Sequence, residues 1–139
     1  MVAGRGGTGI RVLGGVSWVG LFAADVEALV PFYRDALGLT LVGRTDNSAI
    51  FALTDGALLE LVPGGVAADG GRKGHGAQSM QLGLAVTDLE AVRAALVERG
   101  ITPGDVQTFR DWRWARVVDP EGNVLQLVER GGDLFQGTL

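Results

Sequence analysis

The sequence predicts an α+β fold that contains two copies of one β-α-β-β-β module. Its 139 residues are 47% hydrophobic and 20% charged, which is the balance of a globular protein large enough for one core. The second half of the chain repeats the order of motifs found in the first half. Within each half, four segments have the pattern of strands and one has the apolar spacing of a helix.

The internal repeat is clearest at the two ends of the module. Residues 19–21 (Val-Gly-Leu) align with residues 82–84 (Leu-Gly-Leu), and residues 56–62 align with residues 122–128 in the same order. The offset between the two alignments grows by only a few residues, which loop insertions explain. We therefore divide one structural domain into a flexible N-terminal head (1–14), a first module (16–63), a Gly-rich linker (64–78), a second module (79–130) and a tail (131–139).

The first module begins with a strand and a helix. Residues 17–22 predict the strand, Asp25 suits the N-cap of the helix, and Gly38 suits its C-cap. Pro31 falls inside this helix and lacks an amide hydrogen, so we expect a kink there or a helix that begins only at Pro31. Three further strands are predicted at 39–44, 49–54 and 57–62.

The second module has the same order of elements. A strand at 80–86 precedes a helix at 88–99, whose apolar residues share one face. The other strands are predicted at 106–109, 112–118 and 123–129, and the turn Asp119-Pro120-Glu121-Gly122 joins the last two.

Composition excludes several classes of protein. The 16 acidic residues against 12 Lys and Arg give a charge of −4, so no nucleic-acid partner is expected. No segment reaches the roughly 20 apolar residues of a membrane span, and the N-terminus lacks the apolar core of a signal peptide. The chain has no cysteine and one histidine, His75. We expect a cytoplasmic protein without disulfides, thiolate nucleophiles or membrane contact.

Two glycine-rich segments carry motifs of low specificity. Residues 4–9 match G-x-G-x-x-G, but no strand precedes them, so no dinucleotide site is predicted. In the linker, Arg72, Lys73 and His75 form a short basic patch. Such a patch is usually solvated, and the alternative is that it closes over a ligand.

Residues 32–39 (Phe-Tyr-Arg-Asp-Ala-Leu-Gly-Leu) close the first predicted helix, and residues 119–127 (Asp-Pro-Glu-Gly-Asn-Val-Leu-Gln-Leu) lead into the last predicted strand. These two motifs are similar to the first-helix and last-strand signatures of the glyoxalase/bleomycin-resistance/dioxygenase superfamily, whose fold is called the vicinal oxygen chelate fold. The resemblance covers residues 16–130. It implies a concave mixed sheet around a cavity, with the helices outside, and a homodimer. Family members include lyases, epimerases, dioxygenases and non-catalytic antibiotic-binding proteins.

Catalytic members of this family hold a divalent metal through the first and last strands of each module. The resemblance places Trp18, Glu60, Gln81 and Gln126 at these positions. An indole cannot ligate a cation, and one carboxylate with two amides offsets little of the cost of desolvating the ion. We therefore expect no metal cofactor, with weak divalent-metal binding by Glu60, Gln81 and Gln126 as the alternative.

Strand alternation places these four residues on one face of the sheets. Trp112, Trp114 and Arg116 alternate along one predicted strand, on the side that suits the cavity. Aromatic rings stack on planar ligands, and arginine pairs with anions. For Trp112 and Trp114, a dimer contact is an equal alternative. The predicted ligand-binding residues are Trp18, Phe22, Glu60, Gln81, Trp112, Trp114, Arg116 and Gln126.

Three functions are compatible with this set. The first, which we prefer, is a metal-free homodimer that sequesters an aromatic or apolar small molecule such as an antibiotic. The second is a glyoxalase- or dioxygenase-like enzyme, a lyase or isomerase that uses a weak metal site or Glu60 as general base. A carboxylate that is removed from water becomes a stronger base. The third is a structural dimer with a filled cavity, in which Glu60 bonds to Gln81 or Gln126.

Overall fold

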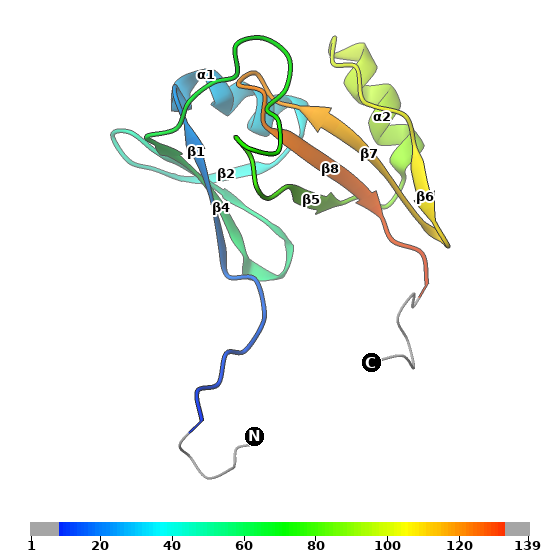
Figure 1. Cartoon of the computed structure of the whole chain (residues 1–139), viewed down its shortest axis with the longest axis horizontal. Coiled ribbons are helices and arrows are strands. Elements are labelled where there is room, and N and C mark those ends of the chain that lie inside the picture. The colour runs from blue at the N-terminus through cyan, green and yellow to red at the C-terminus, as the bar shows by residue number, and fades with distance from the viewer. Residues whose placement is uncertain (1–8, 133–139) are drawn as a thin grey trace.

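The computed structural model describes residues 9–132 and contains two modules with the predicted order of elements (Figure 1). The first module consists of β1 (Trp18–Ala23), α1 (Val26–Pro31), a π-helical turn (Phe32–Ala36), β2 (Thr40–Arg44), β3 (Ala49–Ala52), a 3₁₀ turn (Thr54–Gly56) and β4 (Leu58–Pro63). The second module consists of β5 (Leu82–Ala85), α2 (Leu89–Glu98), β6 (Gln107–Phe109), β7 (Trp112–Val118) and β8 (Val124–Glu129). Parts of the predicted head (1–8) and tail (133–139) lie outside the described residues.

Each module folds into its own four-stranded mixed sheet. The strand orders are β1-β4-β3-β2 and β5-β8-β7-β6. In each sheet the first strand pairs parallel with the last one, and the remaining pairs are antiparallel. Gly20 lies opposite Glu60, and Gly83 lies opposite Gln126, so both modules have the same register. The α+β class and the aligned repeat are confirmed, and the two sheets stay separate instead of closing into a barrel.

Two strand ends differ from the predicted bounds by two residues, and the others differ by at most one. β3 ends at Ala52, and the 3₁₀ turn Thr54–Gly56 takes the place of the end of the predicted strand. Gly56 has a φ of +82°, a conformation that favours glycine and interrupts the extended backbone. β5 begins at Leu82 instead of residue 80, and before it the side chain of Gln78 donates to the carbonyl of Met80 at 2.9 Å.

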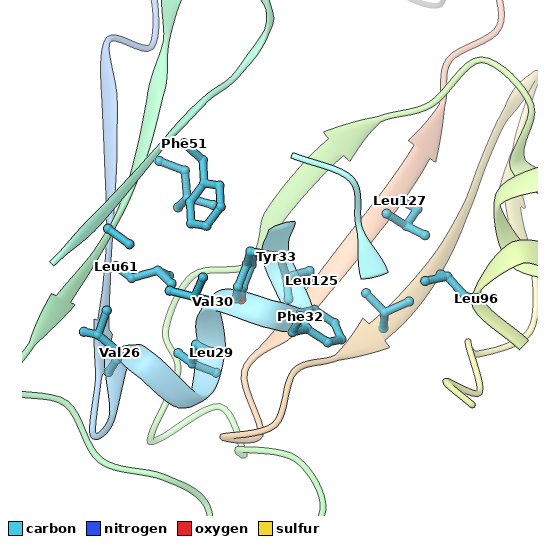
Figure 2. Close-up of a cluster of buried hydrophobic side chains, with 14 of the residues drawn as sticks. Val26, Leu29, Val30, Phe32, Tyr33, Phe51, Leu61, Leu96, Leu125 and Leu127 are labelled. Atoms are coloured by element: carbon cyan, nitrogen blue, oxygen red, sulfur yellow. The ribbon is translucent and has the colours of Figure 1, made fainter. Parts of the chain in front are cut away.

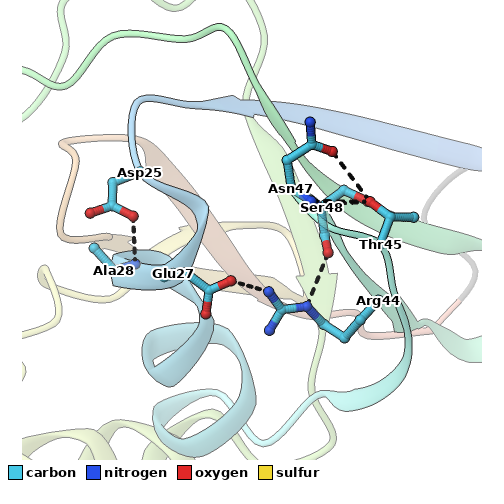
Figure 3. Close-up of polar contacts among 7 residues, drawn as sticks. All are labelled: Asp25, Glu27, Ala28, Arg44, Thr45, Asn47 and Ser48. Carbon is cyan, nitrogen blue, oxygen red and sulfur yellow. Dashed lines mark hydrogen bonds and ion pairs between the residues drawn. The ribbon is translucent and has the colours of Figure 1, made fainter.

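Both helices begin at the aspartates that the repeat aligns. The carboxylates of Asp25 and Asp88 each accept a hydrogen bond from the amide three residues further on, at 3.3 and 3.0 Å. The caps have nearly the same geometry, with φ of −141° and −140°. Glu27 follows the first cap and forms an ion pair with Arg44 of β2 (Figure 3). Within residues 9–132, no helix is long and apolar enough to cross a membrane.

Pro31 changes the geometry of the first helix without ending it. The α-helix reaches Pro31, and the chain continues as a π-helical turn in which the amide of Leu37 donates to the carbonyl of Phe32 at 2.9 Å. Proline has no amide hydrogen, so the α-helical bond at this position is missing in any case. The alternative that the helix begins only at Pro31 is wrong, because α1 begins at Val26. The wider turn follows Pro31 directly, and Gly38 then adopts a φ of +75°.

One hydrophobic core joins the two modules (Figure 2). The face of each sheet that carries the buried strand residues is called the core face here, and the opposite face is called the open face. Leu59 and Leu61 of β4 lie on the core face of the first sheet, and Leu125 and Leu127 of β8 on that of the second. Figure 2 shows α1 and Tyr33 between these two groups. Burying each such side chain contributes about 1.5–3 kcal/mol to stability.

The turn between β7 and β8 attaches the second module to the first helix. The Tyr33 hydroxyl donates to Asp119 at 2.7 Å, and both side chains are buried. Asp119 also accepts hydrogen bonds from two backbone amides and from the side chain of Asn123. Glu121 accepts from the amides of residues 24 and 25, directly before α1, at 2.8 and 2.7 Å. These charge-assisted bonds hold the two modules together.

Candidate functional site

The open faces carry seven of the eight predicted site residues, and the eighth, Gln81, directly precedes β5. On β1, Trp18 and Phe22 are 51% and 57% exposed. On β7, Arg116 is exposed between the buried residues Ala115 and Val117. Alternation along the strands therefore places the predicted residues away from the core.

On the first open face, Trp18 lies across Gly20 and reaches Glu60. The indole Nε1 donates to Glu60 Oε1 at 3.0 Å. A Cβ atom at Gly20 would lie 2.2 Å from the Trp18 ring, so the glycine makes room for the indole. In the filled-cavity alternative we expected Glu60 to bond to Gln81 or Gln126. The structure shows that its partner is Trp18.

The second module contains the equivalent pair. Gln126 Nε2 donates to Gln81 Oε1 at 2.9 Å. The repeat aligns Trp18 with Gln81 and Glu60 with Gln126, so a side-chain bond joins the same two positions in both modules. The four positions at which the resemblance implies metal ligands are thus bonded to each other in pairs.

These four positions do not fit a divalent metal. The set contains one carboxylate, Glu60, and one of its oxygens already accepts the Trp18 N–H. The amide oxygen of Gln81 is likewise engaged by Gln126. Hard cations favour several carboxylate or water oxygens, and softer ones favour imidazole or thiolate. Within residues 9–132, no group of three or more His, Cys, Asp and Glu residues is arranged to hold a metal ion.

The second open face combines an aromatic ring with a guanidinium. Arg116 lies opposite Gln126, and Trp114 lies one position further along the same face of β7. On the other side of β8, the neighbours on β5 are the small residues Gly83 and Ala85. Trp114 is half-buried and Arg116 is exposed. A planar group that stacks on Trp114 would therefore lie beside a cation and above a strand with little side-chain bulk.

Trp112 has a different environment from Trp114. The guanidinium of Arg130 lies 4.8 Å from the centre of the Trp112 ring, at the distance of a cation–π contact. Because a side chain of the chain itself already stacks there, Trp114 is the better candidate for stacking on a ligand.

A cavity of about 380 Å³ lies at the edge of the second open face. Gln81, Arg116 and Val124 line it from the sheet, and Arg72, Lys73 and His75 line it from the linker. Two predicted ligand-binding residues, Gln81 and Arg116, are thus brought together with the basic patch of the linker. Residues 72–75 were not among the predicted site residues, because their distance from the second sheet depends on the path of the linker.

Hydrogen bonds hold the linker against the second module. The amides of Ala68 and Lys73 donate to carbonyls of the β7–β8 turn at 2.8 and 2.7 Å. The side chain of Gln78 bonds to both the amide and the carbonyl of Val124 at 2.8 Å. Gly122 permits this close approach, since a Cβ there would lie 2.5 Å from the Ala68 side chain. The Gly-rich composition predicted flexibility, and these contacts show how the segment is anchored.

A second cavity, of about 300 Å³, lies between β1 and β5. Apolar residues line most of it, among them the core-face residues Val19, Leu59 and Leu125. Gln81 and Val124 line both cavities, so the basic and the apolar cavity adjoin. Among the described residues, no tryptophan or phenylalanine lines either of them. The predicted aromatic residues therefore lie on the open faces outside these two cavities.

Comparison with known proteins agrees with this architecture. Residues 15–127 match the model of the Glyoxalase/Bleomycin resistance protein/Dioxygenase superfamily. A glyoxalase/bleomycin resistance protein from Catenulispora acidiphila DSM 44928 is 25% identical, with a TM-score of 0.60 over 84% of this chain and 100% of its own. A glyoxalase/bleomycin resistance protein/dioxygenase from Alicyclobacillus acidocaldarius is 18% identical, with a TM-score of 0.65 over 86% of this chain and 94% of its own.

A lactoylglutathione lyase from Agrobacterium tumefaciens is 19% identical, with a TM-score of 0.64 over 84% of this chain and 93% of its own. No curated protein sequence matches the chain. At these low sequence identities, the structural similarity shows a shared fold and not a shared activity. The family match covers both modules, and the paired sheets have the matching topology. The chain therefore belongs to the glyoxalase/bleomycin resistance protein/dioxygenase superfamily.

Proposed function

We propose that this protein binds a small aromatic or apolar molecule, such as an antibiotic, on its second open face without a metal cofactor. The observation that carries the proposal is the placement of Trp114 and Arg116. They lie on the same face of one strand, and Arg116 also lines a cavity of about 380 Å³. Ligand pockets of roughly 300–1,000 Å³ with a few polar groups are typical of small-molecule sites.

The two cross-strand pairs favour binding over metal-dependent catalysis. In the family's catalytic members, the equivalent positions supply ligands to the metal. In this chain, Trp18 bonds to Glu60, and Gln126 bonds to Gln81. Each pair satisfies groups that a metal or a substrate would otherwise engage. A metal at these positions would compete with both pairs for their oxygens, and the set would supply only one negative charge.

We also propose that the protein acts in the cytoplasm as a homodimer. The edge strands are β1 and β2 in the first sheet and β5 and β6 in the second, and exposed edges offer unpaired backbone groups to another chain. The segment before β1 carries apolar side chains that are almost fully exposed, with Ile10 at 93% and Leu13 at 97%. Burial of this apolar surface against a second copy would be favourable.

The metal-free proposal predicts the composition of the purified protein. Protein prepared without chelators should contain no stoichiometric nickel, zinc, iron or manganese by elemental analysis, because the four positions supply too few free oxygen donors. The result that contradicts the proposal is about one such ion per chain, lost after substitution of Glu60→Gln. An isomerase or lyase activity that Glu60→Gln abolishes would likewise favour the enzyme alternative.

The stacking role of Trp114 predicts a loss of affinity when the ring is removed. In a screen of aromatic natural products by calorimetry, Trp114→Ala should weaken the binding of a hit by about tenfold to a hundredfold, or 1–3 kcal/mol. Trp114→Phe should retain most of the affinity, because a smaller ring still stacks. The matched control is Phe22→Ala on the first open face. An equal loss in Phe22→Ala, or none in Trp114→Ala, would contradict the assignment to the second sheet.

A further inference from the structure

The cavity beside Arg116 is lined by several basic side chains. Arg72, Lys73, His75 and Arg116 line it, and none of its described lining residues is acidic. The chain as a whole is acidic, with 16 Asp and Glu against 12 Lys and Arg. The basic lining is therefore a local feature that the fold assembles from the linker and from β7.

Several other arginines of this protein are neutralised by carboxylates. Arg34, Arg44 and Arg113 form ion pairs with Asp35, Glu27 and Glu90, respectively. Within residues 9–132, the side chains of Arg72 and Arg116 form no ion pair or hydrogen bond. Two guanidinium groups thus lie at one cavity with their donors available to a ligand.

The remaining lining groups also present hydrogen-bond donors. Gln81 uses its amide oxygen to accept a bond from Gln126, so its NH₂ group is left to donate. The Lys73 ammonium donates one bond to Asn123 at 2.8 Å and retains two further hydrogens. A set of donors with little acceptor capacity matches a carboxylate or phosphate, which only accepts.

The basic residues of the linker are held before any ligand arrives. The amide of Lys73 bonds to Gly122, and the amides of Ala77 and Gln78 bond to Gly74. These bonds form a turn at the segment that carries Arg72, Lys73 and His75. Preorganised groups lose less conformational entropy on binding, which favours affinity.

We propose, building on the proposed function, that the ligand is an organic anion whose carboxylate or phosphate group binds between Arg116 and linker residues Arg72 and His75. The cavity of about 380 Å³ is far larger than an inorganic anion, so it also accepts the adjoining part of an organic molecule. Trp114 lies one position further along the face from Arg116, where it would contact the planar part. The linker residues thereby help to determine that the site prefers anionic ligands over neutral ones.

The test compares charged and uncharged ligands of the same shape. 2-Naphthoate and 2-naphthyl phosphate should each bind at least tenfold more tightly than the neutral 2-naphthamide, and the difference should shrink as salt rises. Arg116→Gln and Arg72→Gln should each weaken binding of the charged compounds about tenfold more than binding of 2-naphthamide. Arg99→Gln, which removes an exposed charge at the end of α2, is the matched control. Tighter binding of 2-naphthoate would identify the anionic group as a carboxylate, and tighter binding of 2-naphthyl phosphate would identify it as a phosphate.

Equal affinity for 2-naphthoate, 2-naphthyl phosphate and 2-naphthamide would overturn the anion proposal while leaving the proposed function intact. Inorganic phosphate provides the converse test. By NMR, it should shift the side-chain amide signals of Gln81 in the wild type and not in the Arg72→Gln, Arg116→Gln double variant. A phosphate response without naphthyl binding would support the anion site and contradict the aromatic ligand. The same phosphate response in the double variant would overturn the anion site.

Discussion

Replacing Asp119 by alanine should lower the free energy of unfolding by about 4 kcal/mol, one of the largest effects expected for a polar substitution in this chain. The buried carboxylate accepts four hydrogen bonds, including one from Tyr33 at 2.7 Å. Its removal leaves the Tyr33 hydroxyl, the Asn123 amide and two backbone amides buried without their acceptor. Chemical denaturation followed by circular dichroism measures the effect.

Two variants separate this network from a general loss of packing. Tyr33→Phe removes one donor and leaves the other three bonds of Asp119, so we expect a loss of only about 1–1.5 kcal/mol. Asp46→Ala, on the exposed turn between β2 and β3, is the control for removing an aspartate and should change stability little. If Asp119→Ala were no more harmful than Asp46→Ala, the turn would not be joining the modules.

Above pH 10, the wild-type protein should lose stability faster than the Tyr33→Phe variant. Burial, and then the negative charge of Asp119, raises the pKa of Tyr33 far above its ordinary value of 10.0. Above pH 10 the unfolded chain releases the tyrosine proton and the folded chain retains it. The stabilisation from this group is therefore complete below pH 10 and falls by about 1.4 kcal/mol for each further pH unit.

The comparison with Tyr33→Phe isolates this effect, because Tyr33 is the chain's single tyrosine. Unfolding free energies of both proteins should be measured from pH 9 to 11.5. Lysine and arginine titrate alike in the two proteins and cancel in the difference. Parallel stability curves for the two proteins above pH 10 would show that the hydroxyl is not buried against Asp119.

The two family signatures meet in one hydrogen bond, which the Tyr33 hydroxyl donates to Asp119. The Asp119-Pro120-Glu121-Gly122 turn stabilises the junction between the modules, and Gly122 lets the linker lie against it. The same turn therefore positions the basic residues beside Arg116. Substitutions at Gly122 would be expected to act on the ligand site through the linker.

The sequence alone determined the elements, their order and the faces of the strands. The repeat aligned Asp25 with Asp88, and both are N-caps in the structure. It also aligned Gly20 with Gly83, and both lie opposite the equivalent residue of the last strand. These features follow from local backbone preferences and from the alternation of side chains, which neighbouring residues encode.

Only the tertiary structure decided which of the predicted site residues meet. Trp18 bonds to Glu60 across two strands, whereas either glutamine was the expected partner of that carboxylate in a filled cavity. The basic residues Arg72 and His75 lie at Arg116, more than 40 positions away in the sequence, although their own segment shows no periodicity. These contacts form because carbonyls of the β7–β8 turn bind the amides of the glycine-rich linker. The local sequence of the linker does not indicate which distant carbonyls its amides will bind.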